Sequence, residues 1–256
     1  MDQEGLICIG GSNAGGHYAD VFRLRWQHGA VQTDTLPPLP VTLANCSGAL
    51  AGNRIYVAGG IHTPDADTAA ADVYMLDLQA LHNGWKALPP CPGPARMLAV
   101  AGADGDDFYL FSGAALHQGK RAYLQDAWRY RPEAGWQRCA DLPQPVVAAP
   151  SPAYGAERLL SIIGGDSGRD AAAAGSLKEH HPGFSTEIIS YDLSHDRWLL
   201  SGKLPVSIHA DAAANPNGSY WAPVTTTLAR WNNMVILPGG EVRPGVRTPH
   251  VWAGKR

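Results

Sequence analysis

A pair of small residues that ends an apolar, β-forming run recurs five times along the chain. The pairs are Gly10-Gly11, Gly59-Gly60, Ser112-Gly113, Gly164-Gly165 and Gly239-Gly240. The second residues of successive pairs are 49, 53, 52 and 75 positions apart. A repeat of this length marks a protein built from successive similar units, so it constrains the fold more than any local pattern.

Each repeat reads as four short strands. A loop and another β-type run follow each pair, as in Asp72-Val73-Tyr74, and Trp85, Trp136 and Trp198 open the next run in three units. Four strands in about fifty residues are typical of a kelch-type β-propeller blade. We therefore predict an all-β kelch propeller with about five blades, forming a single domain over residues 1–256. Glycines in the pairs would suit places where strands crowd or where the chain takes a positive φ, and the tryptophans would fill the space between blades.

The strand order predicts incomplete blades at both ends. The first unit begins on its second strand near Leu6, and the last stops on its third near Ala253. Both units would leave open sheet edges, which proteins usually avoid. We interpret this as the absence of about 70 N-terminal residues, judged from the repeat length, with Met1 an internal methionine. An open five-bladed ring and closure by a partner chain are the alternatives.

Composition and charge limit the classes of molecule that the protein is expected to bind. The net charge is −3, apolar residues make up 45%, and no run of Lys or Arg occurs. These values argue against nucleic acid and membrane surfaces as partners, and no apolar stretch approaches the roughly 18 residues of a membrane span. The acidic first residues are not a signal peptide as they stand. A cytoplasmic or a periplasmic location therefore remains open, as does the oligomeric state.

The cysteines and histidines that could bind a metal ion do not occur in the spacing of a metal-binding site. The four cysteines are scattered, which favours independent buried thiols over a disulfide framework or a metal site. Adjacent His180 and His181 would point apart on a helix, and no third ligand is evident. We predict neither a metal nor a cofactor.

The longest spacing contains two additional segments. One is the loop 166–185, in which Asp170 could cap a short helix that stops at Pro182-Gly183. The other is the link 203–220. Each segment is either a lid over a pocket or a surface loop that does not contribute to a pocket.

Residues just after the pairs gather on one face of a propeller, around its centre, and are the candidates for a site. They include Asn13, His62, Asp166, Glu241 and Arg243. In the last loop, Pro244-Gly245 suits a type II turn that would bring Glu241 and Arg247 to the same space. An ordinary ion pair within a turn is the alternative interpretation.

This last loop carries a family resemblance. The stretch Gly240-Glu241-x-x-Pro244-Gly245-x-Arg247-Thr248, with residues 223–231 before it, resembles the sialic acid mutarotases, also called N-acetylneuraminate epimerases. The similarity is closest to the cyclically permuted mutarotase subgroup. Residues 5–13, 36–41 and 181–185 support it, and it extends over essentially the whole chain. The family's propellers have six blades, so the resemblance implies that about five of six blades are present.

The resemblance implies a site and a reaction. It places the family's active-site pair on Glu241 and Arg247, and the substrate would be N-acetylneuraminate or a related small acidic sugar. Mutarotation requires a proton removed from the anomeric hydroxyl and one delivered to the ring oxygen, for which Glu241 is the candidate. Arg247 would hold the sugar carboxylate, with Arg243 and Arg96 as weaker candidates. Asn13, His62 and Asp166 are further candidates for substrate binding.

Two other functions compete with this one. A non-catalytic kelch propeller that binds a protein or carbohydrate partner would expose an apolar patch on one face. A copper radical oxidase would need paired Tyr and His ligands with a cross-linked Cys, and the sequence shows no such set.

Overall fold

The chain forms five successive antiparallel sheets. In each sheet a small-residue pair directly follows, or lies within, the strand that takes the second of four positions in the repeat. The computed structural model describes residues 5–231 and 234–255. In every pair the first residue has a φ of 54–67° and the second a φ of 96–128°, a region that glycine enters without steric cost. A Cβ on Gly60 would lie 2.6 Å from the Ala44 carbonyl oxygen. Ser112 is the exception, and its hydroxyl donates to the Leu124 carbonyl and accepts from the Val146 amide.

The strands follow the chain order within each sheet. The first sheet contains β1 (Leu6–Ile9), β4 (Val21–Gln27) and β5 (Ala30–Thr35), and the second contains β6 (Ser47–Ala51), β7 (Arg54–Ala58), β8 (Val73–Asp77) and β9 (Trp85–Ala87). The third contains β11 (Val100–Asp104), β12 (Asp107–Phe111), β15 (Ala127–Arg131) and β16 (Gly135–Cys139). The fourth contains β17 (Tyr154–Ala156), β18 (Leu159–Ile163), β19 (Glu187–Asp192) and β20 (Arg197–Lys203). The fifth contains β21 (Ala229–Trp231), β22 (Met234–Arg243) and β23 (Val246–Gly254).

The loops between these strands contain short strands and helical turns. One small sheet joins β2 (Ser12–Asn13) and β3 (Gly16–His17), and another joins β10 (Arg96–Met97), β13 (Ala114–His117) and β14 (Lys120–Tyr123). The helical turns are η1 (Leu81–Asn83), η2 (Ala171–Ala173), α1 (Ala174–Leu177), η3 (Lys178–His180) and η4 (Pro216–Gly218). No helix in the described part of the chain is long and apolar enough to cross a bilayer.

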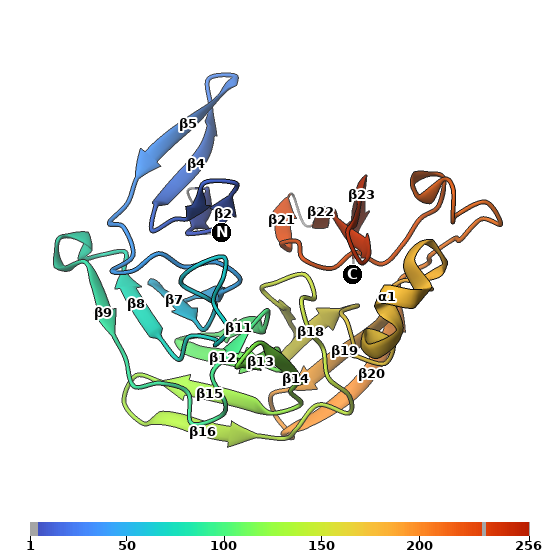
Figure 1. Cartoon of the computed structure of the whole chain (residues 1–256). Helices are drawn as coiled ribbons and strands as arrows, with labels where there is room; N and C mark the ends of the chain where they lie inside the picture. Colours follow the sequence, from blue (N-terminus) through green and yellow to red (C-terminus); the bar gives the residue numbers. More distant parts are fainter. Residues whose placement is uncertain (1–4, 232–233, 256) are drawn as a thin grey trace.

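These sheets are the blades of a kelch-type β-propeller, as predicted. Figure 1 shows them in chain order around an arc, with the first (blue) and last (red) at its two ends. The first blade has strands at its second to fourth positions and the fifth at its first to third, which confirms the strand order read from the sequence. Met1 lies outside the described residues.

Aromatic side chains and indole hydrogen bonds join neighbouring blades. Tyr56 of the second blade stacks on Phe108 of the third at 5.1 Å between ring centroids. Each of three equivalent indoles donates a 2.8 Å hydrogen bond to a carbonyl that follows the preceding blade: Trp85 to Pro37, Trp136 to Pro89 and Trp198 to Ala140. The predicted position of the tryptophans between blades is therefore confirmed. Cys139 is buried, whereas the other three unpaired cysteines are only half-buried.

Main-chain hydrogen bonds also link one blade to the next around the inner side. Four non-glycine residues precede the innermost strands in the left-handed conformation, with φ values of 52–56°: Asn45, Leu98, Ala148 and Thr225. The Leu98 amide donates to the Asn45 carbonyl at 2.8 Å, the Ala148 amide to Leu98 at 2.8 Å, and the Thr225 amide to Ala148 at 2.7 Å. We call this series the inner hydrogen-bond chain.

A buried ion pair supports the third blade and accounts for Arg96. This guanidinium is 2% exposed, and it donates to both carboxylate oxygens of Asp126 at 2.7 and 2.6 Å. The Trp128 indole adds a bond of 2.6 Å to the same carboxylate. Burial acts to raise the pKa of Asp126, but the hydrogen bonds and charge of Arg96 outweigh it, and the pKa is lowered. Arg96 thus serves the fold.

The Asp126→Asn variant tests this pair. It leaves a buried guanidinium without its counter-charge, so we expect the free energy of unfolding to fall by about 3–5 kcal/mol. The matched control is Asp141→Asn, which breaks the exposed Arg138–Asp141 pair and should cost no more than about 1 kcal/mol. Urea unfolding measures both, and equal losses would contradict a special contribution from the buried pair.

The pH dependence of stability provides a second test. Because the pKa of Asp126 is lowered on folding, its contribution is complete above the unfolded-state value of 3.8 and is lost as the pH falls through the folded-state value. The stability difference between wild type and Asp126→Asn should therefore be smaller near pH 3 than at neutral pH. Urea unfolding at several pH values measures it, and a constant difference would contradict the assignment.

Candidate active site

The residues of the inner hydrogen-bond chain are part of the lining of a cavity of about 600 Å³. All four of them, Asn45, Leu98, Ala148 and Thr225, belong to its lining. Loops from the third, fourth and fifth blades contribute the rest: Arg121, Tyr123, Val147, Asp166, Ala171, Ala174, His181, Phe184, Val224, Glu241 and Pro244. The cavity is therefore built on the surface where the blades are joined.

Two acidic residues enter this cavity from equivalent positions in two blades. Asp166 and Glu241 each directly follow a glycine pair, and each forms a two-way main-chain bridge with the segment before the innermost strand. The bridge of Asp166 to Val147 has bonds of 2.8 and 2.9 Å, and that of Glu241 to Val224 has two bonds of 2.8 Å. The equivalent residues of the second and third blades are Ile61 and Ala114. Only these two of the four positions thus carry a carboxylate.

Glu241 is held by the turn that the sequence predicted. Gly245 has a φ of 74°, as the third residue of a type II turn requires, and Glu241 lies opposite Arg247 in the strand register. The Gly245 amide donates to the Glu241 Oε1 at 2.8 Å, and the Thr225 hydroxyl lies 3.4 Å from Oε2. The half-buried carboxylate therefore has a fixed orientation and remains in contact with the cavity.

Arg247 is directed at the same neighbour as Glu241. Its Nη2 donates to the Thr225 carbonyl at 3.3 Å, its side chain is exposed, and it is not part of the cavity lining. The turn thus brings both side chains to Thr225. Among the described residues, Glu241 forms no ion pair with Arg247.

Asp166 is held by an amide and a phenol. It accepts from the Gly168 amide at 2.8 Å and from the Tyr123 hydroxyl at 3.0 Å. Burial, together with the neighbouring Asp166 charge, raises the pKa of Tyr123 to about 12. The phenol is therefore protonated at neutral pH and acts as a hydrogen-bond donor.

Sequence reasoning did not find the hairpin β13–β14, which brings Arg121 and Tyr123 into the cavity. The hairpin occupies the loop after the third small-residue pair, where the first blade has only the shorter hairpin β2–β3. Its two-residue turn, Gln118-Gly119, has φ values of 50° and 73°, as a type I′ turn requires. The glycine in this turn, flanked by two short strands, was the signal available in the sequence.

The insertion at 166–185 forms another wall of the cavity. Short helical turns occupy residues 171–180, close to the prediction, but the Asp170 side chain does not cap them and instead pairs with Arg169. Buried His181 accepts from the Gly183 amide at 3.1 Å. The Arg243 guanidinium donates to the Glu179 carbonyl and lies 5.5 Å from the Trp221 ring centroid. Arg243 thus ties this insertion to β22.

Four predicted binding residues lie outside the lining of this cavity. Arg96 and Arg243 are each 2% exposed and already paired. The Asn13 side chain accepts from the Gly15 amide within its own turn. The His62 ring contacts the Asp72 carboxylate at 3.0 Å and the Thr42 carbonyl at 3.1 Å, and so joins loops of the first and second blades.

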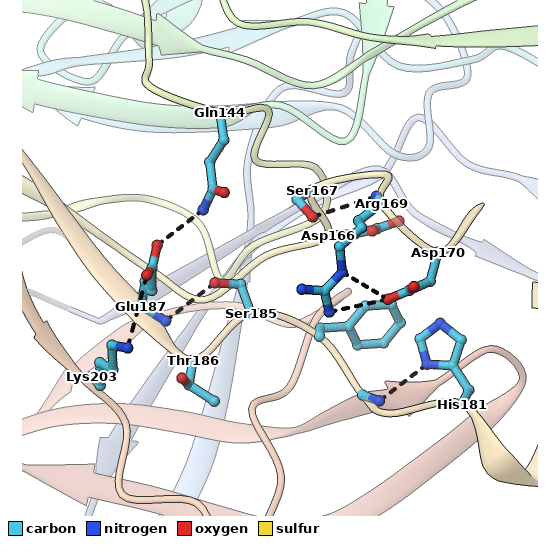
Figure 2. A pocket seen from close by; sticks show the side chains of 12 residues that line it. Gln144, Asp166, Ser167, Arg169, Asp170, His181, Ser185, Thr186, Glu187 and Lys203 are labelled. Atoms are coloured by element: carbon cyan, nitrogen blue, oxygen red, sulfur yellow. Dashed lines mark hydrogen bonds and ion pairs between the residues drawn. The ribbon is translucent and has the colours of Figure 1, made fainter. Parts of the chain in front are cut away.

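A smaller polar cavity of about 270 Å³ adjoins the main one. Asp166, His181 and Phe184 line both. Figure 2 shows its other polar groups largely engaged with each other, with Gln144 and Lys203 both directed at Glu187. Within residues 5–231 and 234–255, no group of His, Cys, Asp and Glu is arranged to hold a metal ion.

Fold and site together define the class: a kelch-type β-propeller whose inner loops build a cavity that contains two carboxylates. The family model described as N-acetylneuraminate epimerase matches residues 36–256. The chain belongs to the N-acetylneuraminate epimerase family.

Individual relatives agree with this assignment. The N-acetylneuraminate epimerase of Haemophilus influenzae (strain 86-028NP) is 28% identical over 248 residues, which cover 88% of this chain and 60% of the relative. That of Yersinia enterocolitica is 25% identical over 244 residues, covering 86% and 57%. The chain thus spans about 60% of the length of these curated relatives.

The Gly168→Ala variant tests how Tyr123 is positioned. Gly168 has a φ of 77°, and a Cβ there would lie 2.7 Å from the Tyr123 ring. We expect a loss of about 1–3 kcal/mol in the free energy of unfolding from backbone strain, with displacement of the ring. The control is Gly175→Ala in α1, where a Cβ meets nothing within 4 Å and stability should change by at most about 1 kcal/mol, in the favourable direction. Urea unfolding and the Tyr123 ring resonances measure these effects, and an unperturbed Gly168→Ala variant would contradict the contact.

Proposed function

We propose that this protein is a mutarotase that interconverts the anomers of N-acetylneuraminate or a related acidic sugar by acid–base ring opening. The observation that carries the proposal is the Glu241 carboxylate, fixed by the Gly245 amide at the cavity surface. Its relatives are named as epimerases of the same sugar. No cofactor is required by the proposed reaction.

Glu241 performs the proton transfers in this mechanism. Its carboxylate removes the proton of the anomeric hydroxyl while the bond between the anomeric carbon and the ring oxygen breaks and the ring oxygen takes up a proton. The open-chain ketone then rotates and closes from its other face. The reverse transfers restore the protonation state of Glu241, so the same carboxyl can act as base and as acid, with a water molecule completing the path.

The other groups bind and orient the sugar in this proposal. Asp166, supported by Tyr123 and Gly168, accepts hydrogen bonds from sugar hydroxyl groups. Arg247 holds the Thr225 carbonyl, and Thr225 in turn contacts Glu241. The geometry therefore favours Arg247 as a support for the Glu241 loop rather than as the ligand of the sugar carboxylate.

The Glu241→Gln variant tests the proposed role. Amide for carboxylate keeps the size but removes the base, so the enzymatic rate of anomer exchange should fall by roughly 10²–10⁴-fold. Proton NMR of freshly dissolved crystalline N-acetylneuraminate follows both anomers and is corrected for uncatalysed exchange. Glu133→Gln, in an exposed turn of the third blade, is the control and should retain full activity. A Glu241→Gln variant as active as the control would refute the assignment.

A further inference from the structure

Arg121 is a cavity-lining cation that has no partner of its own among residues 5–231 and 234–255. It lies on β14, and its guanidinium forms no hydrogen bond or ion pair with the residues that the structure describes. The neighbouring arginines differ, because Arg243 is bound to the Glu179 carbonyl and Arg247 to the Thr225 carbonyl. Arg121 is also the one Lys or Arg among the described residues lining the cavity.

The hairpin that carries Arg121 is firmly attached. At its base, Ala114 and Ala115 pair with Met97 and Arg96 of β10. Two further main-chain bonds of 2.9 Å join it to the loop of the second blade, from the Ala69 amide to Leu116 and from the Gly119 amide to Asp67. The guanidinium is therefore carried by an ordered strand rather than by a free loop.

The strand period places Arg121 beside the site. Side chains two positions apart on a strand lie on the same side, and Arg121 and Tyr123 both line the cavity while Lys120 and Ala122 do not. Tyr123 is fixed by its bond to Asp166. Arg121 thus projects on the side of the hairpin where the proposed hydroxyl-binding groups lie.

The charges of the cavity require a cation when the ligand is an anion. Asp166 and Glu241 both contribute carboxylates to the lining, and they would repel the carboxylate of an acidic sugar. A guanidinium offers two parallel N–H groups that match a carboxylate, and such bidentate pairs are stronger than neutral hydrogen bonds. Arg121 supplies this group without the loss of an existing contact.

We propose that Arg121 is the residue that binds the sugar carboxylate and so selects acidic over neutral sugars. This inference rests on the proposed function and deepens it by assigning substrate charge recognition to the hairpin β13–β14. Arg247 then positions Glu241 through Thr225, and the two arginines have separate tasks.

The test measures binding without turnover. The probe is the methyl glycoside of N-acetylneuraminate, which keeps the carboxylate but cannot open its ring, and the comparison probe is the methyl ester of that glycoside. Calorimetric titration of wild type and Arg121→Gln should show the acid bound roughly 10- to 100-fold more weakly by the variant. The ester should bind weakly and equally to both proteins. Lys120→Gln, on the other side of the same strand, should bind the acid like wild type.

Each contrary result has a separate meaning. Unchanged affinity of Arg121→Gln for the acid overturns the inference, and so does an equal loss for acid and ester, since that loss would reflect a disturbed hairpin. An unfolding midpoint equal to that of wild type checks the fold of the variant. If wild type binds neither probe, the inference falls, and NMR of N-acetylneuraminate anomer exchange then decides the proposed function independently. If wild type accelerates exchange while Arg121→Gln binds as wild type does, only the inference fails.

Discussion

The inner hydrogen-bond chain is the constraint on which the cavity depends. Three main-chain bonds of 2.7–2.8 Å connect Asn45, Leu98, Ala148 and Thr225 across four blades. Each of these residues adopts the left-handed backbone conformation, and each lies at the bend that leads the chain to an innermost strand. The two-way bridges of Asp166 and Glu241 are formed by the residues just before Ala148 and Thr225. Blade-to-blade spacing and carboxylate position are therefore set by the same short segments of backbone.

Indole bonds and aromatic stacking act at other contacts between blades. The equivalent tryptophans of the second to fourth blades each reach a carbonyl beyond the preceding blade, and Tyr56 stacks on Phe108 between two sheets. With these contacts holding the blades, the loops after the small-residue pairs are free to differ. One such loop became the hairpin β13–β14, another the helical insertion before Phe184, and a third the Glu241 turn.

The sequence predicted the fold well because the repeat is visible in the glycine pairs, whose positive φ has few alternatives. It also predicted the turn that fixes Glu241, since Pro244-Gly245 determines its own local geometry. It failed where partners are distant. Arg96 was a predicted substrate-binding residue, but it is buried against Asp126, a partner thirty positions further along the chain that the sequence pattern does not reveal. Arg121 and Tyr123 were not predicted because the hairpin β13–β14 that brings them to the cavity leaves the spacing of the repeat unchanged.

The left-handed backbone conformation of the residues at the cavity is strained most at Thr225. A glycine would relax this backbone, and Thr225, as a β-branched residue at a φ of 52°, is the least suited of the four to it. Its hydroxyl nevertheless lies beside Glu241, and its carbonyl accepts from Arg247. The strained residue is thus also the contact point for both members of the loop pair. Glycine at position 225 would relieve the strain but would also remove the hydroxyl beside Glu241, so stabilising the scaffold here would cost a contact to the carboxylate that we propose as the catalytic group.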